Sequence, residues 1–359
     1  MLSRGVLSAV TPPGGLTQTQ RLLLAAVISA MTGFPATMDG APLDEAGLAE
    51  ALAPRSVEFR TRIVQVMILL GLVLHPIPEE VADRIAAYAA ALSVEEGMVE
   101  VARRFAEGSL GLAAFDFDRN GYASTWDPGS TAVLGTTRRL GSAWDVDPAD
   151  PELAARWRAL EDNPPGTLGR RVADFYRARG FTYPGTPGSA PPLLAQHDWV
   201  HVLADYGTTV ESELEVFAFI ARANDDLHAF SLLAMVVSLF ETGYLRTGAG
   251  LFESSPGHLS HHGMATRVAD AMRRGALCEG SIDFLKVDWF ALASLPVEGA
   301  RDHFGVPPKS LDAVEAGSVG PWEPGGISPF QVGAGTSLAE VEGRPYDSYG
   351  ACVAEEPEP

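Results

Sequence analysis

Apolar residues in the first hundred positions recur at the three- and four-residue spacing of an amphipathic α-helix. The segments that show this pattern are 22–31, 60–74, 81–92 and 98–105. The segment 60–74 is apolar on every side, which predicts a helix in the core rather than on the surface. No stretch alternates apolar and polar residues for long enough to predict a strand. The pattern therefore predicts an all-α fold.

The length of 359 residues favours two helical domains followed by a tail. We expect an N-terminal helical domain at 1–115, a linker at 116–149, a metal-binding helical bundle at 150–309 and a tail at 310–359. The tail is rich in Gly, Pro and acidic residues. Such a composition buries little apolar surface, so we expect an irregular, extended, acidic arm across the globular body.

Charge and cysteine content exclude several classes of protein. The 46 acidic residues against 26 Lys and Arg give a formal net charge of −20. Nucleic acid is therefore excluded as the main partner, because phosphate binding needs clustered Lys and Arg. Cys278 and Cys352 cannot form a disulfide framework, and no Cys-x-x-Cys pair offers a thiolate metal site.

The sequence shows no sign of a membrane span or a signal peptide. The longest apolar stretch, 230–240, is well short of the roughly 20 residues that a helix needs to cross a bilayer. We interpret it as a core helix. The N-terminus lacks a compact apolar run before a small-residue cleavage site. We expect a cytoplasmic protein with at most peripheral membrane contact.

A cluster of chemically reactive side chains begins at residue 197. His197 and His201 are four residues apart and therefore share one face of a helix. Asp198 lies three residues before His201 and joins the same stripe. A separate apolar stripe runs beside it: Trp199, Val202, Leu203 and Tyr206. The helix is thus predicted to pack by one flank and to present two imidazoles and a carboxylate on the other.

The next helix adds a fourth polar side chain. Gly207 predicts a helix end, and Thr208 followed by Glu211 predicts a capping box that starts a new helix. Glu213 falls among the apolar positions of that helix, whereas Glu211 and Glu215 are expected to face solvent. An ionised Glu on a buried face is costly unless it is paired or ligates a cation.

A chain that turns back at Gly207 brings Glu213 to face the first helix. Four nitrogen and oxygen ligands then converge from two helices, a set that suits zinc or a similar divalent ion. They are His197, Asp198, His201 and Glu213. Zinc is the expected metal, with iron and manganese as alternatives.

The segment HDWVH, followed after eleven residues by Glu213, reproduces the HDxxH(x11)E signature of the coenzyme Q biosynthesis protein four family. The upstream segments PGTLG (165–169) and RRVADFY (170–176) also resemble that family. So do Arg273-Arg274-Gly275 and the segment 285–306. The resemblance spans roughly residues 150–308. The chain departs from the family at 182–192, which is rich in Pro and Gly where the family is more regular and charged.

The resemblance implies an all-α fold that holds a divalent metal beside an apolar groove for a prenylated aromatic ring. It implies the ligands His197, Asp198, His201 and Glu213. The family acts in ubiquinone biosynthesis, in replacing a ring carboxylate by hydroxyl and in organising partner enzymes. The implied activity is a metal-dependent oxidative decarboxylase of a prenylated hydroxybenzoate-like ring. The implied partners are that apolar molecule and other quinone-biosynthesis enzymes. We expect the apolar residues of 216–239 to line the groove.

Two other functions stay open. The domain is also compatible with a non-catalytic lipid-binding scaffold in which the metal only fixes two helices, or with a metal-dependent hydrolase that uses the His-Asp-x-x-His site. A zincin protease would need His-Glu-x-x-His, and Asp198 is one methylene shorter. An HD-type phosphohydrolase needs another upstream His, for which only His75 is present.

Three further motifs have ordinary structural interpretations. The segment Asp116–Asp127 fits the EF-hand template at five positions, but Pro128-Gly129 replaces the exit helix, so we interpret it as a polar turn. The Asp39-Gly40 turn followed by Glu45 resembles tellurite-resistance TerB-like helical domains, in which such acids hold a metal. We interpret it as a turn and a helix start, where acids are favoured. A second group of imidazoles is interpreted as a solvated helix start: His258, His261 and His262.

Overall fold

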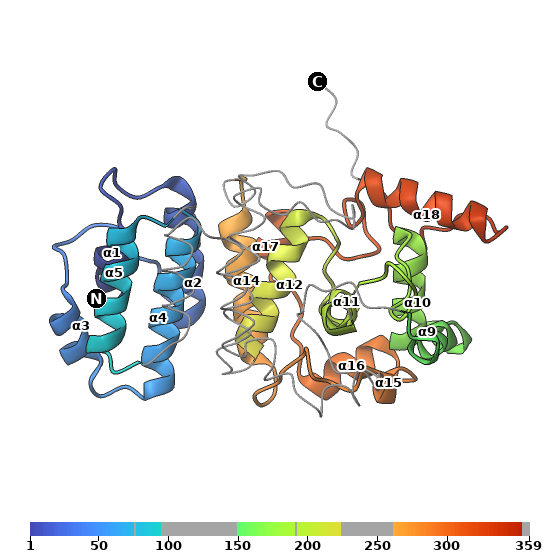
Figure 1. Ribbon diagram of the computed structural model, residues 1–359, viewed down its shortest axis with the longest axis horizontal. Coiled ribbons are helices and arrows are strands. Elements are labelled where there is room, and N and C mark those ends of the chain that lie inside the picture. Colours follow the sequence, from blue (N-terminus) through green and yellow to red (C-terminus); the bar gives the residue numbers. More distant parts are fainter. Residues whose placement is uncertain (75–76, 95–148, 191, 224–260, 354–359) are drawn as a thin grey trace, which may run out of the picture. The chain divides into compact units, whose positions relative to one another are not determined.

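Figure 1 shows the computed structural model of the chain, which describes residues 1–74, 77–94, 149–190, 192–223 and 261–353. Within these ranges the regular elements are helices, accompanied by two isolated β-bridges. The predicted all-α class is confirmed. The EF-hand-like segment, the apolar stretch 230–240, the predicted helix 98–105, His75 and His258 lie outside the described residues.

The chain divides into two compact units. Of the described residues, the first unit holds 1–94 with its short gap, 217–223 and 261–276. The second holds 149–216, apart from residue 191, and 277–353. The helix α12 (Val210–Ala223) therefore contributes its first half to the second unit and its second half to the first. The expected linear boundaries at 115, 149 and 309 stay a prediction.

The first unit is built around the apolar helix predicted at 60–74. Its helices are α1 (Leu2–Val10), α2 (Gln18–Thr32), α3 (Glu45–Leu52), α4 (Val57–Leu72) and α5 (Glu79–Ala91). Helix α4 packs against α1, α2 and α5. Every residue of α4 from Ile63 to Leu70 is buried, as expected of a helix that is apolar all round.

Local signals in this unit behave as the sequence predicts. Asp44 caps α3 by accepting a hydrogen bond from the Gly47 amide, and Glu45 opens the helix. This confirms the helix-start interpretation of the Asp-Gly segment. His261 and His262 are exposed immediately before α14 (Met264–Leu277), which confirms the second helix-start interpretation.

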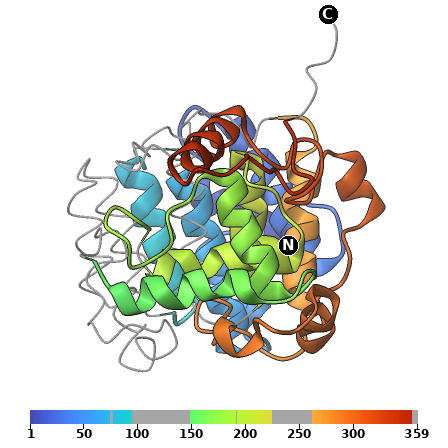
Figure 2. The same cartoon turned by 90° about the vertical axis from the view of Figure 1, so that its right-hand side faces the viewer.

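Helix α10 (Leu168–Arg179) lies at the centre of the second unit. It contacts the short helix η1 (Ala159–Asp162), α11 (Pro192–Ala204), α15 (Trp289–Leu292), α16 (Val297–Phe304) and α18 (Pro329–Val341). The remaining helices of this unit are α9 (Pro151–Arg158) and α17 (Leu311–Glu315). Figure 2 shows α18 crossing the end of α10. The helix that carries the two histidines, α11, is therefore held from the side by α10.

The C-terminal residues differ from the expected irregular arm. They contain α17 and α18, and α18 begins with a capping box between Ser328 and Gln331. Helix α18 approaches α10 so closely that a Cβ atom on Gly335 would lie 2.3 Å from the carbonyl oxygen of Ala178. The expectation was based on the composition of the whole tail. The stretch 329–339, however, has no charged residue, and it packs through small side chains.

Two glycines test whether α18 is held against the end of α10. Gly180 and Gly343 both have φ +68, but a Cβ on Gly180 would lie 2.4 Å from the Ala334 carbonyl carbon, and a Cβ on Gly343 would meet nothing within 4 Å. Gly343→Ala should cost roughly 1–2 kcal/mol of unfolding free energy from the left-handed backbone alone. Gly180→Ala should cost about 1–3 kcal/mol more because α18 must shift. Urea unfolding of both variants measures this, and equal losses would contradict the close packing.

Candidate metal centre

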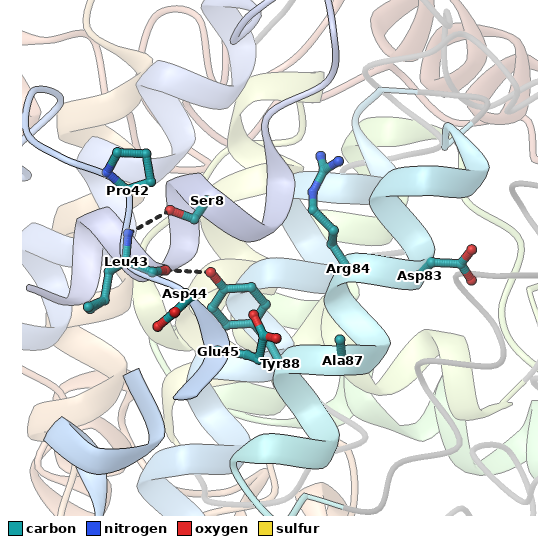
Figure 3. Close-up of a pocket in the computed structure, with 9 residues that line it drawn as sticks. All are labelled: Ser8, Pro42, Leu43, Asp44, Glu45, Asp83, Arg84, Ala87 and Tyr88. Atoms are coloured by element: carbon teal, nitrogen blue, oxygen red, sulfur yellow. Dashed lines mark hydrogen bonds between the residues drawn. The ribbon is translucent and has the colours of Figure 1, made fainter. Parts of the chain in front are cut away.

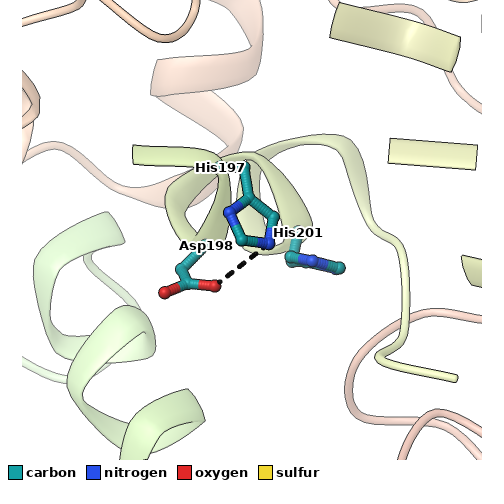
Figure 4. A group of neighbouring side chains, drawn as sticks. All are labelled: His197, Asp198 and His201. Carbon is teal, nitrogen blue, oxygen red and sulfur yellow. Dashed lines mark ion pairs between the residues drawn. The ribbon is translucent and has the colours of Figure 1, made fainter. Parts of the chain in front are cut away.

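Helix α11 presents three of the four predicted ligands on one side (Figure 4). His197, Asp198 and His201 are all buried, and their potential ligand atoms lie within 4.8 Å of one another. Among the residues that the structure describes, these three form the one group of His, Cys or carboxylate side chains with metal-like spacing. Asp39 and Glu45 belong to no such group.

The fourth predicted ligand reaches the same place from α12. Glu213 Oε1 lies 3.2 Å from His201 Nε2, and Glu213 Oε2 lies 3.5 Å from His197 Nε2. Asp198 Oδ1 is also 3.5 Å from His197 Nε2. The structure therefore brings together all four side chains that the helical spacing and the buried position of Glu213 predict.

The ring of His201 is oriented by a backbone carbonyl. Its Nδ1 lies 2.7 Å from the carbonyl oxygen of Gly207, which can only accept, so Nδ1 carries the proton. In the neutral ring Nε2 then holds a lone pair. This atom is buried and has no hydrogen-bond partner among the described residues. It faces Glu213 Oε1, another acceptor, so the pair needs a proton or a metal ion between its two atoms.

A divalent metal satisfies this requirement. Tetrahedral zinc with bonds of about 2.0–2.1 Å holds its ligand atoms about 3.3–3.4 Å apart. The separations of 3.2 Å and 3.5 Å between Glu213 and the two imidazoles are close to that value. A metal-bound His commonly donates its other N–H to a carbonyl, as His201 does. The donor set of two imidazoles and two carboxylates fits zinc, and it also suits iron or manganese.

The two carboxylates respond differently to burial. Burial acts to raise the pKa of Glu213, but the adjacent imidazoles of His201 and His197 outweigh it and lower that pKa to about 2. Burial raises the pKa of Asp198, with partial opposition from the same two rings. Glu213 is therefore the stronger anionic partner of the imidazoles.

Asp198 is held from behind by α10. The Tyr176 hydroxyl donates a hydrogen bond to Asp198 Oδ2, while Oδ1 faces His197. Burial, together with the charge of Asp198, raises the pKa of Tyr176 well above its ordinary value, so the phenol keeps its proton. With Oδ2 held in this way, Asp198 Oδ1 points at His197, where it can act as a ligand or orient that ring.

The connection between α11 and α12 departs from the predicted capping. Helix α11 ends at Ala204, and Asp205 takes the left-handed conformation there, with φ +64. Helix α12 is capped by Thr209, whose hydroxyl accepts a hydrogen bond from the Ser212 amide at 3.4 Å. Thr208, which was expected to make the cap, is buried, and its hydroxyl is hydrogen-bonded to Arg179 and Gln331 instead. The prediction missed the true cap by one residue.

The expected exposure of Glu215 is wrong. Glu215 is 0% exposed, as buried as Glu213. Helix α12 is buried on all its sides between Ser212 and Ala221, so no face is left for solvent. The sequence-based assignment assumed a surface helix with one apolar face, whereas α12 is buried over this whole stretch.

Two residues of the centre were not identified from the sequence. The Phe175 ring lies 5.4 Å from the His201 ring, centroid to centroid, and the Arg179 guanidinium lies 4.0 Å above Phe175. Burial lowers the pKa of Arg179 to about 9, against the opposing charges of Tyr346, Asp198 and Glu213, so the group stays charged at neutral pH. A sequence signal was available: Phe175 lies in the RRVADFY segment, and Arg179 follows it four residues later on the same face of α10.

The first unit contains a separate hollow of about 660 Å³ (Figure 3). Its polar side chains serve the surrounding backbone. Tyr88 donates to the Leu43 carbonyl, Ser8 accepts from the Leu43 amide, and Arg84 donates to the carbonyls of Ala9 and Thr11. These contacts explain the hollow as local packing.

None of the helices in the described ranges has both the length and the apolar character of a membrane span.

Comparison with protein-family models and with curated proteins finds no match. One solved structure is similar, that of a "putative ubiquinone biosynthesis protein" from Nostoc punctiforme. The similarity has a TM-score of 0.31 and 18% sequence identity, and covers 69% of this chain and 97% of that protein. A TM-score this low does not establish a shared fold.

The hydrogen bond behind Asp198 gives a stability test. Tyr176→Phe leaves a buried carboxylate oxygen without its donor, which should cost about 1–3 kcal/mol of unfolding free energy. Tyr183→Phe is the matched control, because the Tyr183 hydroxyl donates to Glu161 in a partly exposed position and its ring stacks on Tyr176. Its cost should stay below about 1 kcal/mol. Chemical unfolding of both variants measures these free energies. A larger loss of unfolding free energy in Tyr183→Phe than in Tyr176→Phe would contradict the role of Tyr176 in holding Asp198.

Proposed function

We propose that this chain is a divalent-metal-binding protein with zinc, iron or manganese held by His197, His201 and Glu213, and with Asp198 completing or orienting the set. The observation that carries the proposal is the buried lone pair of His201 Nε2, which faces the Glu213 carboxylate at 3.2 Å. Such an arrangement is costly in the absence of a cation. Zinc is our first choice because two imidazoles and carboxylates at these separations fit its bond lengths.

We further propose that the metal centre serves a prenylated aromatic ring, as an enzyme or as a carrier. The support is the signature of His197, Asp198, His201 and Glu213 at the spacing found in the coenzyme Q biosynthesis protein four family. A ligand would approach from the side of His197 and Asp198. These side chains are 7% and 6% exposed, whereas His201 is 0% exposed.

A bound metal would act as a Lewis acid that polarises a phenolic or carboxylate oxygen of the ring. In this scheme Tyr176 keeps Asp198 oriented and Phe175 excludes water from the His201 side. Iron or manganese would suit replacement of a ring carboxylate by hydroxyl, in which the carboxylate leaves as carbon dioxide, water supplies the hydroxyl and dioxygen takes up two electrons to become hydrogen peroxide. Zinc has no redox chemistry and would suit a carrier. The proposed partners are the ring compound and other quinone-biosynthesis enzymes.

A non-catalytic scaffold is the second candidate. Structural zinc sites are closed by four protein ligands, and here four side chains are buried around one point. In this case the metal would fix α11 against α12 and no bond would be broken. The coordination number of the bound metal distinguishes the two, because a catalytic site keeps one position open.

Metal binding is tested with two glutamates of the same helix. Zinc at 100 times its dissociation constant should stabilise the wild-type chain by about 2.7 kcal/mol, with one zinc bound per chain. Glu213→Gln should abolish this gain because a ligand is lost. Glu215→Gln is the control: Glu215 is buried on the same helix but is outside the cluster of predicted ligands, so this variant should keep the zinc-dependent gain.

Thermal unfolding with and without zinc, together with elemental analysis, measures both effects. A wild-type chain that takes up no zinc, iron or manganese would remove the proposed function. If both variants lose the metal-dependent gain in stability equally, the assignment of Glu213 rather than Glu215 as the metal ligand is wrong.

The ring is tested by adding a prenylated hydroxybenzoate to the metal-loaded chain and following binding and carbon dioxide release. Binding with release of carbon dioxide under the iron- or manganese-loaded condition would support the enzyme. Binding without release would support the carrier. The same hydroxybenzoate without its prenyl chain is the control and should bind at least tenfold more weakly, because it buries less apolar surface. Failure of both compounds to bind would remove the ring from the proposal and leave the metal.

A further inference from the structure

The segment Ser318–Gln331, here called the C-terminal brace, lies against the connection that joins α11 to α12. The Gly207 amide donates to the Val319 carbonyl at 3.0 Å, and the Thr208 amide donates to the Gly326 carbonyl at 3.1 Å. Residues more than a hundred positions away in the chain therefore bind both amides of this short connection.

These contacts orient the carbonyl that binds His201. The Gly207 carbonyl and the Thr208 amide belong to one peptide group, which is planar, and in the trans form its C=O and N–H point in opposite directions. When the Thr208 N–H is bound to Gly326, the Gly207 oxygen is directed to the other side. There it accepts the proton of His201 Nδ1 at 2.7 Å. One peptide group thus links the brace to the imidazole.

Two buried side chains join Thr208 to the brace. Arg179 donates from Nε to the Thr208 hydroxyl at 2.7 Å, and from Nη2 to the carbonyls of Pro321 and Gly326 at 2.8 and 2.9 Å. Gln331 accepts from the Thr208 hydroxyl at 2.7 Å and donates to the Thr208 carbonyl at 3.1 Å. The side chains of Arg179, Thr208 and Gln331 are all buried, so water does not replace these bonds.

The backbones of the two segments also touch directly. A Cβ atom on Gly207 would lie 2.8 Å from Gly326 Cα, and one on Gly326 would lie 2.1 Å from the Gly320 carbonyl oxygen. Only glycine permits such an approach of two main chains. A side chain at either position would push the connection and the brace apart.

We propose that the C-terminal brace is the outer support of the metal centre. Through the Gly207–Thr208 peptide group it holds the His201 ring with Nδ1 protonated and Nε2 directed at Glu213, and docking of the brace and binding of the metal favour each other. This inference rests on the proposed metal site. Because coupling between two sites is reciprocal, metal should tighten the brace as much as the brace tightens the metal. Thr208, Gln331 and Arg179 are positioning residues, since none touches the metal position.

The test uses the Thr208 hydroxyl in the full chain with Zn²⁺ as the probe. Thr208→Val keeps the size of the side chain but removes the hydroxyl that Arg179 and Gln331 share. We expect zinc affinity, measured by competition with a chromophoric chelator, to fall about 10–100-fold, as when the outer partners of ligands are lost. Thr208→Ser restores the hydroxyl and should recover most of the affinity. Thr336→Val is the control, because that hydroxyl donates to the Val332 carbonyl within α18 and lies outside the brace.

Two measurements separate positioning from a general loss of stability. In the metal-free wild-type chain, nitrogen NMR should show the His201 ring protonated on Nδ1, and in Thr208→Val a mixture of ring forms. In the wild type, Zn²⁺ should slow amide hydrogen exchange in residues 318–331, and Thr208→Val, if it folds, should lose this effect.

Unchanged zinc affinity in folded Thr208→Val, or brace amides in the wild type that exchange equally with and without bound zinc, would overturn the proposal. A wild-type chain that binds no zinc would instead remove the metal site itself. In that event the NMR measurement still reports whether the brace sets the ring form.

Discussion

A buried imidazole and a buried carboxylate that face each other with lone pairs are the constraint on which the second unit depends. His201 Nε2 and Glu213 Oε1 are 3.2 Å apart in a region from which water is excluded. Such a pair is stable only with a proton or a metal ion between its members. Contacts that hold either group in place therefore also favour binding of a cation between them. The buried α12, the glycine contact at the connection and the aromatic ring of Phe175 all keep water away from this point.

Helix α10 organises this environment from one side. Phe175, Tyr176 and Arg179 lie within about one turn of the same helix. They reach the His201 ring, the Asp198 carboxylate and the Thr208 hydroxyl respectively. The Arg179 guanidinium also supplies a buried positive charge near two carboxylates, which reduces the cost of keeping both of them away from water. A single helix thus connects the ligands, their orientation and the C-terminal brace.

The degree of closure of the site bears on its chemistry. His201 and Glu213 are deeply enclosed, whereas His197 and Asp198 lie at the slightly more open edge. An open coordination position at that edge would favour catalysis, and closure by Asp198 would favour a structural role. The hydrogen bond from Tyr176 to Asp198 bears on this choice, because it occupies one carboxylate oxygen and directs the other towards His197.

The sequence by itself determined the local features of this protein. Helical spacing placed His197, Asp198 and His201 on one face, and the apolar neighbours of Glu213 indicated its burial, because both properties depend on residues within one or two turns. The buried helix α4 and the helices α2 and α5 followed from the same reading of the apolar positions.

Only the tertiary structure decided the features that depend on distant contacts. The burial of Glu215 follows from packing on all sides of α12, the use of the Thr208 hydroxyl from Arg179 and Gln331, and the helix α18 from the surface of α10. No local pattern records these contacts, because each partner lies far away in the chain. From local sequence Thr208 is a typical helix cap, but in the structure its hydroxyl is bound to the buried Arg179 and Gln331 side chains.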